Sequence, residues 1–525
     1  MTDVPVATGS SASADESGGA TGRARETSRG SRWRPGTGPL LAAAASGALL
    51  AAGMPPRSIW YLLPVGTALL TWALLHTSRR ERAVLGAVAG LAFFALTLSW
   101  LTGFHPAGFA AVLVIEVVLF AAAMLLVDPR PARWWTVPAA LVVLEAVRAR
   151  FPFGGFPIPG MALGQLDGPF TAAAPLGGAP LVLGLAAAAG AAVTGVAAGG
   201  RRPRSLVALG ALAAGSTAGL VLAQPDDGPA RQLRVALVQG GGPRGIPAVV
   251  SDADAVTERQ FQQSEDLPAG LDLVLWPESS IAVSGSVART REAERVAGLA
   301  VRTGATVVAG LSESYATGFR NAAVAWDPEG RIVDRYEKVH RVPFGEYIPG
   351  RSLFERVTDM TSLVPQDAIP GRGPGLLVTP AGPLGVVISY EVFFADRTRA
   401  AVTAGAQVLL VPTNAASYTT EEVPATEVAA ARMRALETDR AVLQAAPTGY
   451  TAIIEPDGQV IAQGGLSTPE VLTATVPLRT GLTLYTRSGD APVLASAALL
   501  LLAAPLRRLL GSRGAAPRRR ERSGI

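Results

Sequence analysis

Long apolar runs dominate the first half of the chain, and they constrain its fold more than any other feature. Seven runs lie between residues 38 and 223, and an eighth lies close to the C-terminus. Several approach the roughly 20 residues that a helix needs to cross about 30 Å of hydrocarbon, and shorter runs can tilt or thin the bilayer. The runs span residues 38–54, 59–76, 83–102, 108–127, 134–149, 178–199, 205–223 and 490–506. They predict a polytopic α-helical membrane protein with about eight spans.

The composition favours a membrane protein over a soluble one. Hydrophobic residues make up 49% of the 525 residues and charged residues 17%, against about 25% charged residues in an average soluble protein. Seven buried apolar helices in one soluble fold would leave too little polar surface, and the same balance excludes a disordered chain or a coiled coil. The net charge of +5 comes from arginines that lie mostly beside the apolar runs, so it does not indicate nucleic-acid binding.

Arginines mark alternate connections between the apolar runs. Twenty lie in the two tails and one set of loops, and three lie in the opposite loops. Cytoplasmic loops of membrane proteins carry the excess of positive charge. Both termini are therefore predicted to be cytoplasmic, and the segment between the seventh and eighth runs is predicted to face outward. The twenty are Arg23, Arg25, Arg29, Arg32, Arg34, Arg79, Arg80, Arg82, Arg130, Arg133, Arg201, Arg202, Arg204, Arg507, Arg508, Arg513, Arg518, Arg519, Arg520 and Arg522, and the three are Arg57, Arg148 and Arg150.

These patterns divide the chain into five parts. Residues 1–36, rich in Ser, Gly, Thr and Arg, are expected to form a disordered cytoplasmic tail, and residues 37–223 a seven-span membrane domain. Residues 232–478 read as a soluble α/β domain, followed by a transmembrane helix at 490–506 and a basic cytoplasmic tail at 507–525. A cleaved signal peptide is not expected, because further apolar runs follow the tail at once.

The α/β domain shows alternating strand and helix patterns. It is long enough to bury a core without disulfides, and the chain has no cysteine, which excludes disulfides, Cys-bound metals and a thiol nucleophile. Turn-forming residues at 327–330 and 455–458 predict hairpins. The predicted strands are 233–239, 271–276, 306–311, 384–388 and 407–411, and the predicted helices include 287–302 and 424–440.

Three short segments of this domain carry candidate chemistry. Glu278 follows a buried apolar run, a common place for a general base, although a glutamate at a strand end is also a common surface or capping residue. Lys338 is the only lysine in the chain, which suggests a need for a compact ammonium or a dissociable amine that arginine does not supply; chance survival is the alternative. Ser389 ends the run that begins at Val386 and precedes Glu391, so it is either a nucleophile or a turn-forming serine.

In order and spacing, these segments resemble the carbon–nitrogen hydrolase (nitrilase) superfamily, with its Glu-Lys-Cys triad and αββα sandwich. Together with the apolar runs, they resemble the apolipoprotein N-acyltransferase family. The resemblance covers about residues 38–506. Further matching segments are 153–157 (Phe-Gly-Gly-Phe-Pro), 165–169 (Gln-Leu-Asp-Gly-Pro), 175–178 (Pro-Leu-Gly-Gly), 342–349 (Val-Pro-Phe-Gly-Glu-Tyr-Ile-Pro) and 432–449, which begins Arg-Met-Arg-Ala-Leu-Glu.

The resemblance implies a role for each matching residue. Glu278 would be the base, Lys338 the oxyanion stabiliser and Ser389 the acyl acceptor. The supporting residues would be Glu346, Glu391, Tyr390 and Asn414. No metal and no cofactor are implied.

The chain departs from the family pattern at three places. Ser389 stands where the family has a cysteine nucleophile. Residues 414–418 read Asn-Ala-Ala-Ser-Tyr and lack the usual Asp and Trp, and residues 239–242 read Gln-Gly-Gly-Gly where the family has Gln-Gly-Asn. A serine hydroxyl is much harder to ionise than a thiol, so these departures bear on activity.

Three functions remain open from the sequence. The resemblance implies transfer of a fatty acyl chain from a phospholipid donor to the N-terminal diacylglyceryl-cysteine of apolipoproteins, through an acyl-enzyme, at the outer side of a bacterial cell membrane. The alternative is a catalytically silent membrane scaffold of the same fold, because the cysteine nucleophile is absent. A membrane-tethered amide or nitrile hydrolase is a third reading, but it leaves the seven leading runs unexplained.

Overall fold

The computed structural model describes residues 36–199, 231–245, 252–356, 361 and 364–512. The predicted seventh run at 205–223, residues 1–35 of the first tail and residues 513–525 of the last tail lie outside these residues. The described chain has a helical part and an α/β part.

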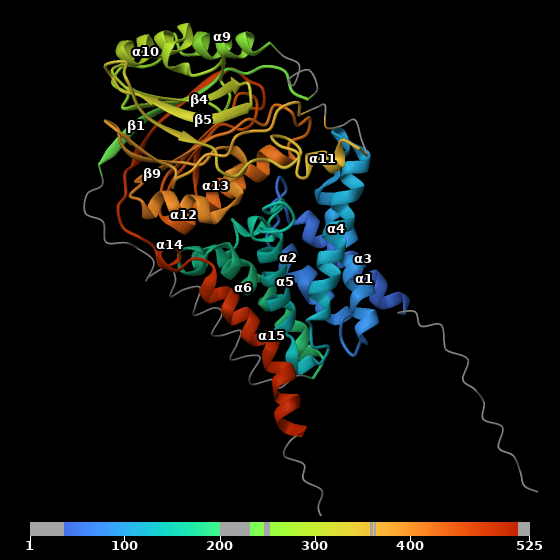
Figure 1. Ribbon diagram of the computed structural model, residues 1–525. Coiled ribbons are helices and arrows are strands. Elements are labelled where there is room, and N and C mark those ends of the chain that lie inside the picture. Colours follow the sequence, from blue (N-terminus) through green and yellow to red (C-terminus); the bar gives the residue numbers. More distant parts are fainter. Residues whose placement is uncertain (1–35, 200–230, 246–251, 357–360, 362–363, 513–525) are drawn as a thin grey trace, which may run out of the picture. The chain divides into compact units, whose positions relative to one another are not determined.

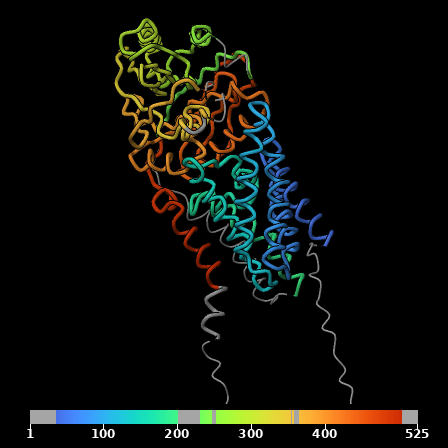
Figure 2. Tube along the Cα trace, turned by 45° about the vertical axis from the view of Figure 1, so that its right-hand side comes forward, coloured from blue at the N-terminus to red at the C-terminus, as the bar shows by residue number. Residues whose placement is uncertain are grey.

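Six of the predicted N-terminal runs and the C-terminal run form helices. Helix α1 packs against α2 and α3, α3 packs against α4, and α2 and α5 both pack against α6 (Figure 1, Figure 2). Glycines permit close approach: a Cβ added at Gly47 in α1 would lie 2.1 Å from the carbonyl oxygen of Ala89 in α3. The helices are α1 (Thr37–Ala52), α2 (Leu62–Ala73), α3 (Arg79–Thr97), α4 (Pro106–Leu125), α5 (Thr136–Arg148), α6 (Ala174–Ala197) and α15 (Ala491–Ser512).

Two of the described helices are long and apolar enough to cross a membrane, Pro106–Leu125 and Pro169–Ala197. Thr37–Ala52, Leu62–Ala73 and Ala491–Ala503 are apolar but shorter. On α4, Val114 and Val118 are each about 60% exposed, so this helix presents apolar side chains outward. The count of eight spans stays a prediction.

Arg148 differs from its predicted place in a loop. It is the last residue of α5, is fully buried, and forms ion pairs with Glu116 at 2.7 Å and Glu145 at 2.6 Å. Its guanidinium also donates to the carbonyl oxygens of Pro159 and Ile158. Arg148 therefore holds the loop that follows α5 against the helices.

The α/β part contains two mixed sheets. Parallel neighbours are β1–β2, β2–β4, β3–β4, β8–β9 and β9–β10, and the remaining pairs are antiparallel. One sheet has the order β13 (Glu470–Pro477), β1 (Gln232–Gln239), β2 (Leu273–Leu275), β4 (Thr306–Tyr315), β5 (Gly318–Trp326) and β6 (Ile332–Glu337), with β3 (Ile281–Ser284) also paired to β4. The other has the order β12 (Val460–Gln463), β11 (Ala452–Ile454), β10 (Val442–Ala445), β9 (Val408–Pro412), β8 (Gly382–Val386) and β7 (Leu376–Thr379).

The two sheets face each other across an apolar core and carry helices on their outer faces. Fully buried residues of both sheets share the core, among them Leu273 and Leu443. Helices α9 (Ala253–Gln263) and α10 (Arg291–Thr303) cover the first sheet, and α12 (Ala395–Thr403) and α13 (Glu422–Thr438) cover the second (Figure 1). The predicted αββα sandwich is therefore present.

Shorter elements complete the described chain. The five predicted strands, both predicted helices and both hairpin turns occur within a few residues of their predicted bounds. The short helices are α11 (Arg351–Phe354) and α14 (Leu484–Ser488), and the 3-10 turns are Ser99–Gly103, Pro131–Arg133, Met161–Gln165, Pro169–Ala173, Val287–Arg289 and Ser389–Phe393.

Candidate active site

Three sheet strands deliver the predicted site residues from their carboxyl ends. Glu278 follows β2, Lys338 follows β6 and Ser389 follows β8. The turn that carries Glu278 crosses β4 at a glycine: a Cβ added at Gly310 would lie 2.2 Å from the carbonyl oxygen of Pro277. Only glycine leaves room there for the turn, so β4 fixes the position of Glu278.

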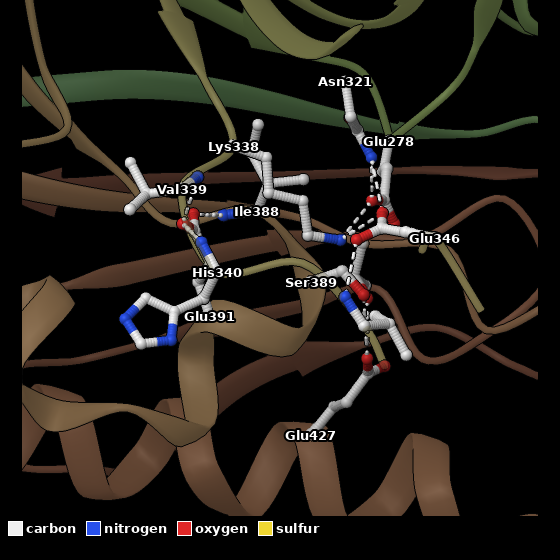
Figure 3. Close-up of polar contacts among 12 residues, drawn as sticks. Glu278, Asn321, Lys338, Val339, His340, Glu346, Ile388, Ser389, Glu391 and Glu427 are labelled. Carbon is white, nitrogen blue, oxygen red and sulfur yellow. Dashed lines mark hydrogen bonds and ion pairs between the residues drawn. The ribbon is translucent and has the colours of Figure 1, made fainter. Parts of the chain in front are cut away.

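Lys338 lies at the centre of a buried ionic cluster (Figure 3). Its Nζ donates to Glu278 Oε1 at 2.9 Å and to Glu346 Oε1 at 2.8 Å. The Nδ2 of Asn321, from β5, donates to the same two oxygens. Because Lys338 is 3% exposed and Glu278 6% exposed, water screens these contacts little. The structure thus brings Glu278, Lys338 and Glu346 together.

Burial and charge act in opposite directions on Lys338. Burial alone lowers the pKa of its ammonium, but the carboxylates of Glu278 and Glu346 outweigh burial and hold the pKa above its usual value. Burial raises the pKa of Glu278, an effect that Glu346 adds to and Lys338 opposes. Lys338 is therefore a fixed ammonium at neutral pH, suited to stabilise a developing oxyanion.

Ser389 occupies a strained turn at the end of β8. Its φ is 49°, in the left-handed region that residues with a Cβ rarely adopt, and the residue is 8% exposed. Such strain costs on the order of 1–3 kcal/mol and is found mainly at functional sites. Within the described residues, the Ser389 hydroxyl makes one hydrogen bond, donated to Glu427 Oε1 at 3.5 Å, and none to Glu278 or Lys338.

Glu427 was not singled out from the sequence. It lies in α13, is 3% exposed, and accepts a second hydrogen bond from Thr413 Oγ1 at 2.8 Å. Burial raises the pKa of Glu427 to about 7. The sequence of the predicted 424–440 helix does not mark Glu427 as a site residue. The helix, α13, is buried on nearly all sides and carries several other buried polar residues. Asn321 likewise lies in a strand of otherwise ordinary sequence.

Glu391 braces the site. It is fully buried and accepts hydrogen bonds from the backbone N–H groups of Val339 at 2.8 Å, His340 at 3.0 Å and Ile388 at 2.8 Å (Figure 3). The hydroxyl of Tyr336 also donates to it. Val339 and His340 directly follow Lys338 in the chain, and Ile388 directly precedes Ser389. The carboxylate therefore ties the segment that carries Lys338 to the segment that carries Ser389.

Replacement of this brace should destabilise the fold. In Glu391→Gln, the amide group can no longer accept the full set of N–H and O–H donors, so we expect a loss of about 3 kcal/mol in unfolding free energy. A lower thermal-unfolding midpoint in detergent would report it. Glu355→Gln is the control, because Glu355 is exposed and its ion pair with Arg351 is 3.7 Å long. Equal midpoints for the two variants would contradict the bracing role.

The helical part contacts the neighbours of the site residues. The hydroxyl of Tyr390 donates to the carbonyl oxygen of Gly155 at 2.9 Å, and that of Tyr347 donates to the carbonyl oxygen of Phe153 at 3.0 Å. The 153–157 motif thus contacts the residues that directly follow Ser389 and Glu346 in the chain. Within the described residues, the side chain of Asn414 makes one hydrogen bond, accepted from the N–H of Ala416 at 3.0 Å within its own loop, and none to Glu278, Lys338 or Ser389.

That loop carries an aromatic contact with the helical part. The Tyr418 ring lies 5.3 Å from Trp100 and 5.4 Å from Phe104, in edge-to-face geometry. Burial, together with the charge of Glu427, raises the pKa of the Tyr418 hydroxyl. Among the described residues, no group of three His, Asp or Glu side chains is placed to hold a metal ion.

Family models match both parts of the chain. Residues 234–482 match the carbon-nitrogen hydrolase model, and residues 46–192 match the apolipoprotein N-acyltransferase N-terminal domain. Both matches agree with the two parts that the structure describes.

Relatives match over most of the chain. An apolipoprotein N-acyltransferase from Mycolicibacterium smegmatis is 30% identical over 90% of this chain and 87% of its own length. One from Gloeobacter violaceus is also 30% identical, over 92% and 96%. Among solved structures, a nitrilase-superfamily protein from Saccharomyces cerevisiae is 18% identical, covers 48% of this chain and 92% of its own, and has a TM-score of 0.35.

Proposed function

We propose a function from the premise that this chain belongs to the apolipoprotein N-acyltransferase family and is an acyltransferase with a carbon–nitrogen hydrolase domain. It transfers a fatty acyl group from a phospholipid to the α-amine of the N-terminal diacylglyceryl-cysteine of a lipoprotein. The acyl group passes through an ester on Ser389. The observation that supports this proposal most is the buried Glu278–Lys338–Glu346 cluster beside the strained turn of Ser389.

The cluster suits an acyl-transfer transition state. An ammonium has three N–H donors, and Lys338 uses two for Glu278 and Glu346. Within the described residues the third has no protein partner, so it can donate to the carbonyl oxygen of the acyl group as negative charge develops there. Ser389 and Lys338 are the proposed catalytic residues that contact the acyl group. Glu278, to which the family resemblance gives the role of base, holds Lys338, and Glu346, Glu391 and Tyr390 complete the supporting set.

A direct assay tests this function. The purified chain is mixed with phospholipid vesicles and a synthetic diacylglyceryl-cysteine peptide, and the products are identified by mass spectrometry. We expect a triacylated peptide and an equal amount of lysophospholipid. Absence of both products in a preparation with intact fold would leave the silent scaffold as the function of this chain.

The proposed location is a bacterial cell membrane, with several spans and with the α/β part outside. The two long apolar helices, the outward valines of α4 and the asymmetric arginines support this arrangement. A site at the outer surface receives the head groups of both lipid-anchored substrates while their chains remain in the bilayer.

Reporter fusions check the topology. Reporters placed after Gln224 or within residues 250–470 should show an outside location, and reporters at either terminus a cytoplasmic one, because the positive-inside rule places the twenty arginines in the cytoplasm. The measurement is the ratio of phosphatase activity, which requires export, to fluorescence of a cytoplasm-specific reporter. A cytoplasmic α/β part would overturn the proposed function.

A further inference from the structure

Glu427 is a buried carboxylate beside the nucleophile and outside the Lys338 cluster. Its Oε1 accepts from Ser389 (Figure 3) and from Thr413. Its Oε2 is buried without a hydrogen-bond partner among the described residues. A buried carboxylate oxygen with unused lone pairs is costly, and its retention calls for a reason. The hydrogen bond that Glu427 accepts from the hydroxyl of Ser389 suggests such a reason.

We propose that Glu427 is the general base that takes the proton of Ser389, the role that the family resemblance gives to Glu278. The inference rests on the proposed acyl-enzyme function. Glu278 is poorly placed for this role, because its Oε1 accepts from both Lys338 and Asn321 and it has no hydrogen bond with Ser389. The 3.5 Å contact to Glu427 is long, as catalytic hydrogen bonds often are without substrate.

The replacement of a thiol by a hydroxyl creates the need for this base. A thiol has a pKa near 8.5 and ionises readily beside a cation, whereas a hydroxyl needs an aligned acceptor at the moment of attack. A base is most effective when its pKa lies close to the working pH. Burial sets the pKa of Glu427 to about 7, and of the charges that face it, Glu278 raises this pKa while Lys338 lowers it. Tyr418, which lies in the loop after β9, also interacts electrostatically with Glu427.

Each half-reaction then conserves protons. In the first, Ser389 Oγ bonds to the carbonyl carbon of the donor ester while its proton moves to Glu427. The ester C–O bond breaks, and the leaving alkoxide takes that proton. In the second, the acceptor amine attacks the acyl-Ser389 ester and gives a proton to Glu427. The C–Oγ bond breaks, and the proton returns to Ser389.

Paired variants in two backgrounds test the assignment. The probe is a p-nitrophenyl fatty ester, which acylates the site without phospholipid or lipoprotein. The readouts are the burst of p-nitrophenolate and the acyl group on the Ser389 peptide by mass spectrometry. We expect Glu427→Gln to slow acylation by about 100-fold or more. Glu437→Gln is the matched control, since Glu437 is buried in the same helix, also with its pKa raised to about 7, but contacts Ala179 and Arg434. It should change the rate by less than about threefold.

The Ser389→Cys background separates a base from a structural residue. A thiol depends less on a base, so Glu427→Gln should there cost less than about tenfold. The pH profile gives an independent readout: acylation of the parent chain should rise as pH increases towards about 7, when Glu427 loses its proton, and then level off. Equal losses in both backgrounds, or a rate within threefold of the parent in Glu427→Gln, would overturn the proposal.

Failure of the proposed function looks different. If the aryl ester acylates Ser389 in a Glu427-dependent way but phospholipid does not, the phospholipid donor is wrong and the base assignment stands. If neither ester acylates Ser389 in the folded parent chain, both the acyl-enzyme and its base are refuted.

Discussion

Ser389→Ala should abolish acylation of the chain, and Ser389→Cys should keep or raise it. Alanine removes the atom that carries the acyl group, and residual turnover should fall at least about 1000-fold, as when other nucleophiles are removed. Cysteine restores the atom type for which a Glu-Lys environment is suited, because a thiol reaches its reactive anion several pKa units more easily. The left-handed φ of 49° is unaffected by either change, so both variants should fold.

The chemistry of the adduct identifies the nucleophile. The parent chain should give an oxygen ester, which survives neutral hydroxylamine better than the thioester formed by Ser389→Cys. Mass spectrometry should place the acyl group on the peptide that contains residue 389 in both chains. An unchanged phenotype in Ser389→Ala would establish the scaffold function, and activity only in Ser389→Cys would show a silenced enzyme with an intact site. A folded but inactive Ser389→Cys would point to residues 414–418.

The sequence predicted those candidate site residues that a short local pattern or the composition marks. Glu278 and Ser389 each follow an apolar run that ends in polar residues, and Lys338 is the only lysine, so each stood out without knowledge of the fold. The α/β class followed from the alternation of strands and helices, whereas the αββα sandwich was implied by the family resemblance. Strand bounds were accurate to a few residues because burial and strand periodicity coincide in this domain.

Contacts between distant segments were not predictable from one sequence. Glu427 lies 38 residues from Ser389 and meets it only because α13 packs behind the strand ends. Arg148 and Glu116, 32 residues apart, neutralise each other inside the helical part, whereas hydropathy alone counts each as an isolated charge. Asn321 gained a role only through the pairing of β5 with β6, which sets it beside Lys338. These contacts depend on which distant segments pack together in the fold, and the local sequence pattern does not show that.

Lys338→Arg should be as damaging to acylation as Lys338→Ala. The Nζ of Lys338 lies between one carboxylate oxygen of Glu278, 2.9 Å away, and one of Glu346, 2.8 Å away. The Lys338 side chain is 2% exposed. A planar guanidinium is larger and directs its donors along a fixed fork, so it cannot meet both carboxylates and keep one donor on the substrate oxygen. Loss of one such donor costs about 100- to 1000-fold in rate, and we expect at least that from either variant.

The two lysine variants should differ in stability while they agree in activity. Lys338→Ala leaves Glu278 and Glu346 buried without their cation, which typically costs about 3–5 kcal/mol, whereas Lys338→Arg keeps a positive charge near them. Thermal unfolding should therefore rank the parent chain first, Lys338→Arg second and Lys338→Ala last, with aryl-ester acylation lost in both variants. Full acylation by Lys338→Arg would show that Lys338 acts only as a charge. The survival of one lysine in a chain otherwise supplied with arginine would then need no catalytic explanation.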